Sequence, residues 1–288
     1  MVAVSVVLCT RNRADPLRDC LASISAQDRV DGEFEVIIVD NGSTDDTAPV
    51  ARTWLSTASH GRYLFEPRVG VANARNTGLA ASEAEIVAFL DDDVRPDRDW
   101  IKRMLDAHHR HPASVAIGGP ITLDWGGSRP GWMRPEFDGW YSGFDMGSCE
   151  RILEPPATLF GANLSVRRAP AEQVGGFDPS LGRAGRSLLS GEEGALIDRL
   201  RCLGDVVYDP DVHVTHEVLS ERRKRRWLLR RGYAQGRTDV RRGRVVDPAS
   251  RLLLQSVRNV GRLRSDGLSD VVRRATIIGR AREVMARP

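Results

Sequence analysis

The chain has 288 residues, of which 41% are hydrophobic and 28% charged, and this composition indicates an ordinary soluble globular protein. No apolar run approaches the roughly 20 residues that a membrane-spanning helix needs. The net charge of +3 is unevenly distributed: residues 1–220 have 33 acidic and 22 basic side chains, whereas residues 221–288 have 6 and 20. We therefore expect a boundary near residue 220.

The start of the chain and its cysteines indicate a cytoplasmic location. No basic leader precedes residues 2–9, whose short, β-branched run favours a first strand over a signal peptide. The cysteines have no CxxC spacing, so reduced thiols are expected instead of disulfides or a zinc site. The expected location is the cytoplasm, with the inner face of the membrane as an alternative.

The first hundred residues alternate between strand and helix patterns. Apolar, β-branched runs predict strands at residues 2–9, 34–40, 63–65 and 86–90. The segments between and after them predict helices at residues 14–27, 43–55, 70–82 and 97–110. This alternation predicts an α/β fold with a parallel sheet and right-handed crossovers. Residues 119–160, rich in glycine, proline and aromatic residues, are expected to form a long loop region.

Polar segments follow three of the predicted strands. They are TRNR (10–13), DNGSTD (40–45) and DDD (91–93). Because ligands on parallel sheets bind beyond the carboxyl ends of the strands, we expect the three segments to meet in one crevice. Three adjacent carboxylates repel one another unless a cation lies among them, and a hard divalent metal prefers carboxylate and phosphate oxygens. The pattern therefore favours a metal and nucleotide site over a helix cap with spare acids.

Five segments, in order, resemble the successive motifs of the family-two glycosyltransferases. They are VSVVLCTRNR, FEVIIVDNGSTDDT, GVANARNTGLAASEAEIVAFLDDD, FGANLSVRRAPAEQVGGFDPSLG and GEEGALIDRLRCLGDVVYDPDVHVTHE. The resemblance implies the glycosyltransferase-A fold, which is Rossmann-like with a mostly parallel central sheet, and a nucleotide-sugar donor. We expect a catalytic domain at residues 1–220, with a nucleotide-sugar-binding half to about residue 118 and an acceptor-binding half after it, followed by a basic helical region at 221–288.

The resemblance implies a donor site at the ends of the first strands. Thr10 and Arg13 would line the nucleotide pocket, and Asp40 would accept a hydrogen bond from the base, as a carboxylate can from the N–H of uracil. Arg75 would lie near the diphosphate. The simpler alternatives are a turn aspartate for Asp40 and a solvated helix arginine for Arg75.

The metal is assigned by the same resemblance. Asp93 would be its chief ligand, while Asp91 and Asp92 would share ribose contacts and water-mediated metal contacts. His216 matches a histidine that completes the metal shell in some relatives, although a lone histidine is more often structural. The expected cofactor is Mn²⁺ or Mg²⁺.

A second acidic pair lies in the segment SGEEGALIDRL. Relatives usually have Glu-Asp here at the start of a helix, and the second acid is the catalytic base. Glu193 occupies that position with one extra methylene, and Glu192 is the alternative base. A helix N-terminus favours the ionised form that a base needs, yet two glutamates in a first turn are also common for this electrostatic reason alone.

The acceptor side is predicted from the middle of the chain. Trp132, Trp140 and Tyr141 could stack on a sugar face or an apolar aglycone, and Asn163 could contact the sugar. The alternatives are core packing for the aromatic residues and a turn role for the asparagine.

The basic C-terminal region allows two main interpretations. Helices predicted at residues 249–263 and 270–285 could pack on the catalytic domain or form a homodimer, or they could rest on an anionic bilayer near a lipid-linked acceptor. The apolar face expected for the second helix consists of Val271, Ala275, Ile278 and Met285. Nucleic acid is not an expected partner, because the basic run lacks a recognised binding module.

The expected function is metal-dependent, inverting transfer of a sugar from a nucleotide sugar, with uridine as the default base, to a sugar, lipid-linked or small-molecule acceptor. A sugar-phosphate nucleotidyltransferase is an alternative, but it would need a glycine-rich loop after the first strand, and CTRNRADP has no glycine. A non-catalytic sugar-binding protein would need neither base nor metal.

Overall fold

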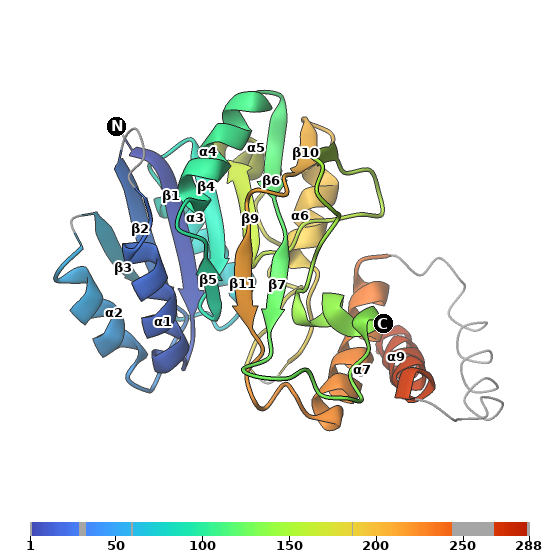
Figure 1. Cartoon of the computed structure of the whole chain (residues 1–288). Coiled ribbons are helices and arrows are strands. Elements are labelled where there is room, and N and C mark those ends of the chain that lie inside the picture. Colours follow the sequence, from blue (N-terminus) through green and yellow to red (C-terminus); the bar gives the residue numbers. More distant parts are fainter. Residues whose placement is uncertain (1, 29–32, 59, 186, 244–267, 287–288) are drawn as a thin grey trace.

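The structure, a computed structural model, describes residues 2–28, 33–58, 60–185, 187–243 and 268–286. Its centre is an eight-stranded sheet with helices on both faces (Figure 1). Across this sheet the strands are β3 (Gly61–Phe65), β2 (Glu33–Asp40), β1 (Val2–Thr10), β4 (Ile86–Asp91), β9 (Asn163–Arg167), β6 (Ser114–Gly118), β10 (Asp205–Tyr208) and β8 (Arg151–Ile152). β3, β2, β1 and β4 are parallel, as expected, whereas β9 is antiparallel to both of its neighbours.

Helices cover the two faces because β1 is apolar on both sides. Val4, Val6 and Leu8 face one core and Val7 faces the other, as the two-residue period of a strand requires. The first core is closed by α1 (Ala14–Ser25), α2 (Thr47–Leu55) and α4 (Trp100–Arg110). The second is closed by α3 (Val71–Ala81), α5 (Arg168–Gln173) and α6 (Glu192–Leu200).

A three-stranded sheet joins the end of β4 to the second half of the chain. Its strands, in order, are β5 (Val94–Pro96), β11 (Val214–Glu217) and β7 (Ile121–Asp124). β5 begins directly after Asp93 and is antiparallel to β11, with His216 opposite Val94. This register brings the side chains of His216 and Asp93 together. The middle segment, expected to be a loop region, contains β7, the 3-10 helix η1 (Pro135–Tyr141) and β8.

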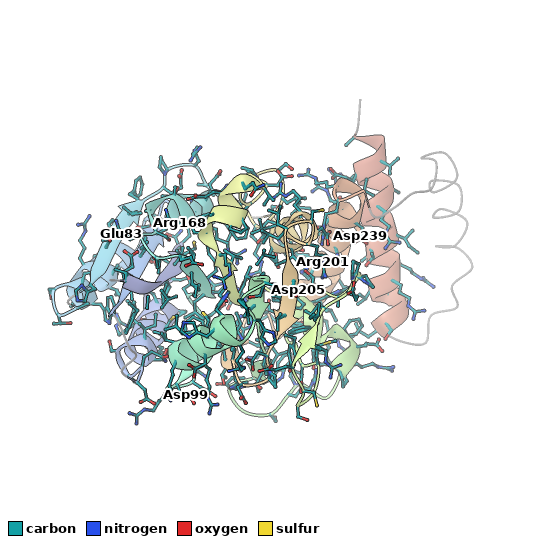
Figure 2. The ribbon with its side chains drawn as sticks, turned by 90° about the horizontal axis from the view of Figure 1, so that it is seen from above. Glu83, Asp99, Arg168, Arg201, Asp205 and Asp239 are labelled. Carbon is teal, nitrogen blue, oxygen red and sulfur yellow. The ribbon has the colours of Figure 1, made fainter. Side chains whose placement is uncertain are left out.

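The C-terminal helices pack on the rest of the protein. Trp227 of α7 (Arg225–Arg241) packs on Tyr141 with 4.6 Å between the ring centroids, and α9 (Leu268–Met285) packs along α7. Asp239 of α7, labelled in Figure 2, accepts a hydrogen bond of 2.7 Å from Arg280 of α9. The helix predicted at residues 249–263 lies outside the described residues.

The apolar face expected for the last helix does not pack on α7 at Val271 and Ile278. Val271 is 39% exposed and Ile278 is 50% exposed, whereas Val272 and Gly279 face α7. The face that α9 presents to α7 contains a glycine, because Gly236 and Gly279 allow the two helix backbones to approach closely. The spacing of apolar residues in the sequence does not predict such a glycine contact. Within the part of the chain that the structure describes, no helix is both long and apolar enough to cross a membrane.

Candidate active site

A cavity of about 1040 Å³ opens at the carboxyl ends of β1 and β4. The register of the parallel strands brings Thr10 beside Asp40 and Cys9 beside Asp91, so the polar segments after these strands share one edge of the sheet. The cavity is lined from this edge, from the start of α6, and from η1, α7 and α9. Its volume lies at the upper end of the usual range for ligand sites, about 300–1,000 Å³.

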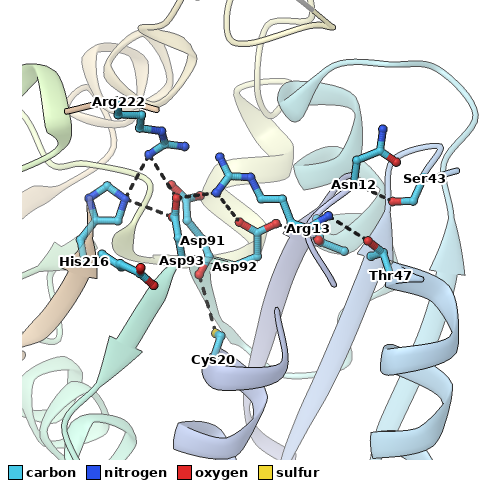
Figure 3. A network of polar contacts seen from close by, with 12 residues as sticks. Asn12, Arg13, Cys20, Ser43, Thr47, Asp91, Asp92, Asp93, His216 and Arg222 are labelled. Atoms are coloured by element: carbon cyan, nitrogen blue, oxygen red, sulfur yellow. Dashed lines mark hydrogen bonds and ion pairs between the residues drawn. The ribbon is translucent and has the colours of Figure 1, made fainter. Parts of the chain in front are cut away.

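The three aspartates differ in exposure and in partners (Figure 3). The side chain of Asp91 is 32% exposed and accepts a hydrogen bond of 3.0 Å from Arg75. Asp92 is buried and accepts a hydrogen bond of 2.7 Å from the Thr10 hydroxyl. Burial raises the pKa of Asp92 to about 7, although Arg13 opposes the shift.

Asp93 lies deepest and is surrounded by cationic groups. Its Oδ2 accepts from Arg13 at 2.8 Å and lies 3.1 Å from Arg222, and its Oδ1 lies 3.1 Å from Nε2 of His216 (Figure 3). Burial alone would raise the pKa of Asp93, but His216, Arg222 and Arg13 hold it well below its usual range. Asp93 is therefore an anion, and basic side chains offset the repulsion within the aspartate run.

The donor atoms at Asp93 and His216 suit a divalent cation. Nδ1 of His216 donates to the carbonyl oxygen of Tyr141 at 2.7 Å, so Nε2, which faces Asp93, is the ring nitrogen that could bind a cation. Among the described residues no cluster of three or more histidine, cysteine, aspartate or glutamate side chains is arranged to hold a metal. A cation here would thus have two protein ligands and take its others from substrate phosphates and water, as Mg²⁺ commonly does. It would also compete with Arg222, which lies 3.5 Å from Nε2.

Arg75 connects the aspartate run to the second acidic pair. Its Nη2 donates to Asp91 at 3.0 Å and its Nη1 donates to Glu192 at 2.8 Å. The guanidinium is packed beneath Gly161, where any Cβ would overlap it. Arg75 is buried, so it is not the solvated helix arginine of the simpler alternative.

Glu192 and Glu193 form the first turn of α6 and both line the cavity. Glu192 is buried, and burial together with the neighbouring Glu193 raises the pKa of Glu192 to about 8, although Arg75 opposes the shift. Glu193 is less buried, and its buried Oε2 has no hydrogen-bond partner among the described residues. Oε2 of Glu192 also has no hydrogen-bond partner there, so the pair differs in burial and in the ion pair of Glu192 with Arg75. Glu193 is therefore the more accessible of the two acids at the cavity.

Two predicted ligand contacts fall on residues with structural partners. Asp40 accepts hydrogen bonds from the backbone N–H of Ser43 at 2.8 Å and from the Tyr63 hydroxyl at 2.7 Å, and it lies outside the cavity lining. Asn163 accepts from Trp100 at 2.9 Å and donates to the Val212 carbonyl at 2.7 Å. Both residues are 1% exposed; the contacts of Asp40 match its turn alternative, whereas Asn163 begins β9 and joins buried groups instead of forming the turn that was its alternative.

The predicted aromatic platform is divided. Trp140 lines the cavity, whereas Tyr141 is 1% exposed between Trp125 and Trp227. Trp132 packs at the edge of the same aromatic cluster, with the Arg225 guanidinium 5.7 Å from its ring centroid. Of the three aromatic residues, Trp140 alone is placed to meet a ligand.

Sequence reasoning did not single out three arginines that line the cavity, Arg183, Arg222 and Arg231. Arg222 and Arg231 belong to the dense basic run, where nothing in the pattern distinguishes an inward-facing arginine from a solvated one. Arg183 belongs to a segment used for the family resemblance, but only as part of a wall. Tertiary contacts alone identify them.

Several known proteins are similar to this chain. A glucosyl-dolichyl phosphate glucuronosyltransferase of Haloferax volcanii is 27% identical over 81% of this chain and 75% of its own length. A pre-mycofactocin glycosyltransferase of Mycobacterium tuberculosis is 30% identical over 81% of this chain and 46% of its own length. The chain thus spans less than half of the second relative.

Solved structures share the fold at low sequence identity. The mannosyltransferase PcManGT from Pyrobaculum calidifontis, in complex with GDP-Man and Mn²⁺, matches 98% of this chain and 74% of its own with a TM-score of 0.60 and 20% identity. The S. aureus TarS fragment 1-349, in complex with UDP, matches 81% of this chain and 65% of its own with a TM-score of 0.59 and 20% identity. These likenesses confirm the expected glycosyltransferase-A fold. The family model described as glycosyl transferase family 2 matches residues 5–174, and the chain therefore belongs to that family.

Proposed function

We propose that this glycosyltransferase moves a sugar from a nucleotide-sugar donor, a UDP-sugar by default, to an acceptor hydroxyl in one metal-assisted displacement that inverts the anomeric configuration. The observation behind this proposal is the Arg75 bridge between Asp91 and Glu192. Because of it, the acidic end of β4 and the acidic start of α6 face the same cavity. A site for the leaving diphosphate and a base for the acceptor can thus lie on opposite sides of one bound sugar.

The donor half of the proposal is supported by position and by the relatives. Ligands bind parallel sheets of this kind beyond the carboxyl ends of the strands, where Thr10, Arg13 and Asp91 lie. TarS 1-349 was solved with UDP, and PcManGT with GDP-Man and Mn²⁺. Mn²⁺ or Mg²⁺ held by Asp93 and His216 would offset the negative charge that develops on the departing diphosphate.

The chemistry at the sugar follows from the position of Glu193. Its carboxylate takes the proton of the acceptor hydroxyl while the hydroxyl oxygen bonds to the anomeric carbon and the bond from that carbon to the diphosphate oxygen breaks. Glu193 lies in the first turn of α6, at the positive end of the helix dipole. Glu192, held by Arg75, positions the first turn of α6.

The acceptor is proposed from the relatives only as a class. The Haloferax volcanii relative is named for a glucosyl-dolichyl phosphate substrate, which supports a lipid-linked acceptor, whereas the mycobacterial relative is named for pre-mycofactocin. Trp140 would contribute an apolar face for the acceptor.

The proposal is tested by measuring nucleotide release from a panel of nucleotide sugars, with Mn²⁺, with Mg²⁺ and in excess chelator. We expect release of nucleoside diphosphate from at least one donor, and its loss in chelator. Asp93→Ala should lower the rate by at least about 100-fold while the circular dichroism spectrum is retained, because such charge stabilisation is worth several kcal/mol. Full activity in chelator would overturn the metal assignment.

Pyrophosphate release from a nucleoside triphosphate and a sugar phosphate would indicate a nucleotidyltransferase, and donor binding without any turnover would indicate a sugar-binding protein.

A further inference from the structure

The wall of the cavity opposite the β1–β4 edge has positive charge that the protein does not neutralise. Most arginines around the cavity are in ion pairs: Arg13 and Arg222 with Asp93, Arg75 with Asp91 and Glu192, Arg242 with Asp198, and Arg280 with Asp239. Arg11, Arg183, Arg231 and Arg273 line the same cavity, and none of them is in an ion pair with any residue that the structure describes; Arg231 is the most buried of the four.

Arg231 is buried, and more than half of its N–H donors are unused. It is 6% exposed, and its Nη2 donates to the Ser190 hydroxyl at 2.9 Å. Its Nε and Nη1 have no hydrogen-bond partner within the described parts of the chain. A buried cation with unsatisfied N–H groups is costly, and an anion in the cavity would remove that cost.

Arg183 faces the same space. It is partly buried in the loop before α6, and burial together with the nearby Arg231 lowers its pKa, although Asp91 and Asp93 oppose the shift. Two guanidinium groups that repel each other across a ligand cavity, without a carboxylate in an ion pair with either, form a strong site for a phosphate.

The position of Arg231 assigns the anion to the acceptor side, and Arg183 lies between Arg231 and the aspartate run. Glu193 and Glu192 are the acids that interact most with Arg231. Gln235 and Thr238 lie four and seven residues after Arg231 on α7 and also line the cavity, so one face of the helix continues the wall. Val272 and Ile277 of α9 add apolar surface to it.

We propose that Arg183 and Arg231 bind an anionic group of the acceptor, a phosphate close to the hydroxyl that receives the sugar. This inference rests on the proposed function, because it takes the Glu193 side of the cavity as the acceptor side. The other source of the same chemistry is an anionic group of the donor, namely its diphosphate or an acidic sugar.

The test is calorimetric titration with glucose 1-phosphate, and with methyl glucoside as its neutral counterpart, in the presence and absence of saturating UDP and Mg²⁺. We expect glucose 1-phosphate to bind with UDP present and methyl glucoside to bind at least about 10-fold more weakly. Arg231→Gln should weaken glucose 1-phosphate binding by about 10-fold to 100-fold, as expected for the loss of charge-assisted hydrogen bonds. The matched control is Arg230→Gln, an exposed arginine one position earlier on α7, which should bind like the wild type. Arg183→Gln provides a second variant should Arg231→Gln fail to fold.

Three results would overturn the inference. They are equal affinity for the two sugars, unchanged affinity in the arginine variants, and displacement of glucose 1-phosphate by UDP, which would give the anion to the donor. Failure of the wild type to bind UDP is a separate outcome and would contradict the proposed function. In that case the titration of glucose 1-phosphate without UDP still tests whether Arg183 and Arg231 bind the phosphate.

Discussion

Glu192 and Glu193 are adjacent in the chain and have different surroundings. Glu192 is buried and accepts a hydrogen bond from Arg75, whereas Glu193 is partly exposed, and each of them has one oxygen without a partner among the described residues. A base must reach the acceptor, so the greater exposure of Glu193 and the absence of a described hydrogen bond with Arg75 favour it for that role. Glu192 instead contributes to the bridge that links α6 to β4.

Glu193→Gln should lower kcat by about 10²- to 10⁴-fold and leave the affinity for UDP unchanged, because an amide keeps the size of the side chain but cannot take a proton. Steady-state kinetics and UDP titration measure the two effects. Glu154→Gln, at an exposed glutamate, is the matched control. Retained activity in Glu193→Gln together with its loss in Glu192→Gln would give the role of base to Glu192.

The raised pKa of Glu192, about 8, predicts a pH-dependent stability. Between the unfolded value near 4.5 and about 8, the unfolded chain releases a proton that the folded protein keeps, so the free energy of unfolding falls as pH rises, by at most about 1.4 kcal/mol per pH unit. Glu192→Gln has no proton to release. We expect its stability, measured by urea unfolding at pH 5, 6.5 and 8, to increase relative to the wild type across this range. A constant difference between the two proteins would contradict the raised pKa.

At the scale of elements, the contact between α7 and α9 builds the acceptor side of the cavity. Gly236 lies against the backbone of α9, where a Cβ would overlap the carbonyl oxygen of Thr276, and Gly279 lies equally close to Tyr233 of α7. Both helices line the cavity, so their spacing determines its width.

Gly236→Ala should therefore destabilise the protein by about 1–3 kcal/mol through overpacking. The sign is informative, because alanine in place of glycine inside an unobstructed helix stabilises by about 0.5–1 kcal/mol. Thermal or urea unfolding measures the change, with Gly131→Ala as control, since a Cβ at Gly131 meets nothing within 4 Å. A Gly236→Ala variant as stable as the wild type would show that α7 and α9 do not pack in this way.

At the scale of the whole molecule, the acidic first 220 residues and the basic remainder meet within the active site. Arg222, two residues into the basic run, contacts Asp93, so the expected boundary near residue 220 crosses the site itself. The division into domains stays a prediction, as does the cytoplasmic location.

We propose a peripheral membrane contact through the exposed part of the basic run and of α9. Val271 and Ile278, seven residues apart on α9, are exposed together with nearby arginines such as Arg282. The protein should sediment with anionic vesicles at low salt and detach as salt screens the charges. Changing the exposed Lys224, Arg226 and Arg230 to Gln should weaken vesicle binding by about 1 kcal/mol each and leave donor hydrolysis unchanged, provided that Arg222 is kept. Wild-type protein that ignores such vesicles at low salt would end this proposal.

Structural features that depend on residues close together in the sequence were predictable. Features that depend on contacts between residues far apart in the sequence were not. The ends of β1, β2 and β4 were expected at one edge, because apolar runs alternate with helices and parallel strands share their polarity. The meeting of His216 with Asp93 was expected from the family resemblance alone, since it requires the pairing of β5 with β11. Arg231 gave no signal, because its burial depends on α7 packing over Ser190. Asp40 and Asn163 have polar side chains like those of a ligand site. In the fold, these side chains form hydrogen bonds with Tyr63 and with the carbonyl oxygen of Val212, respectively, which the sequence could not show.

The central claim, a single displacement with Glu193 as base, is tested most directly by the configuration of the product. Proton NMR can follow the hydrolysis of an α-linked UDP-sugar, with water as the acceptor. The enzyme concentration must be high enough for hydrolysis to be faster than mutarotation of the released sugar. Attack from the side opposite the diphosphate predicts that the β-anomer of the free sugar forms first, and that Glu193→Gln slows its appearance. First appearance of the α-anomer would mean retention of configuration and would contradict the account.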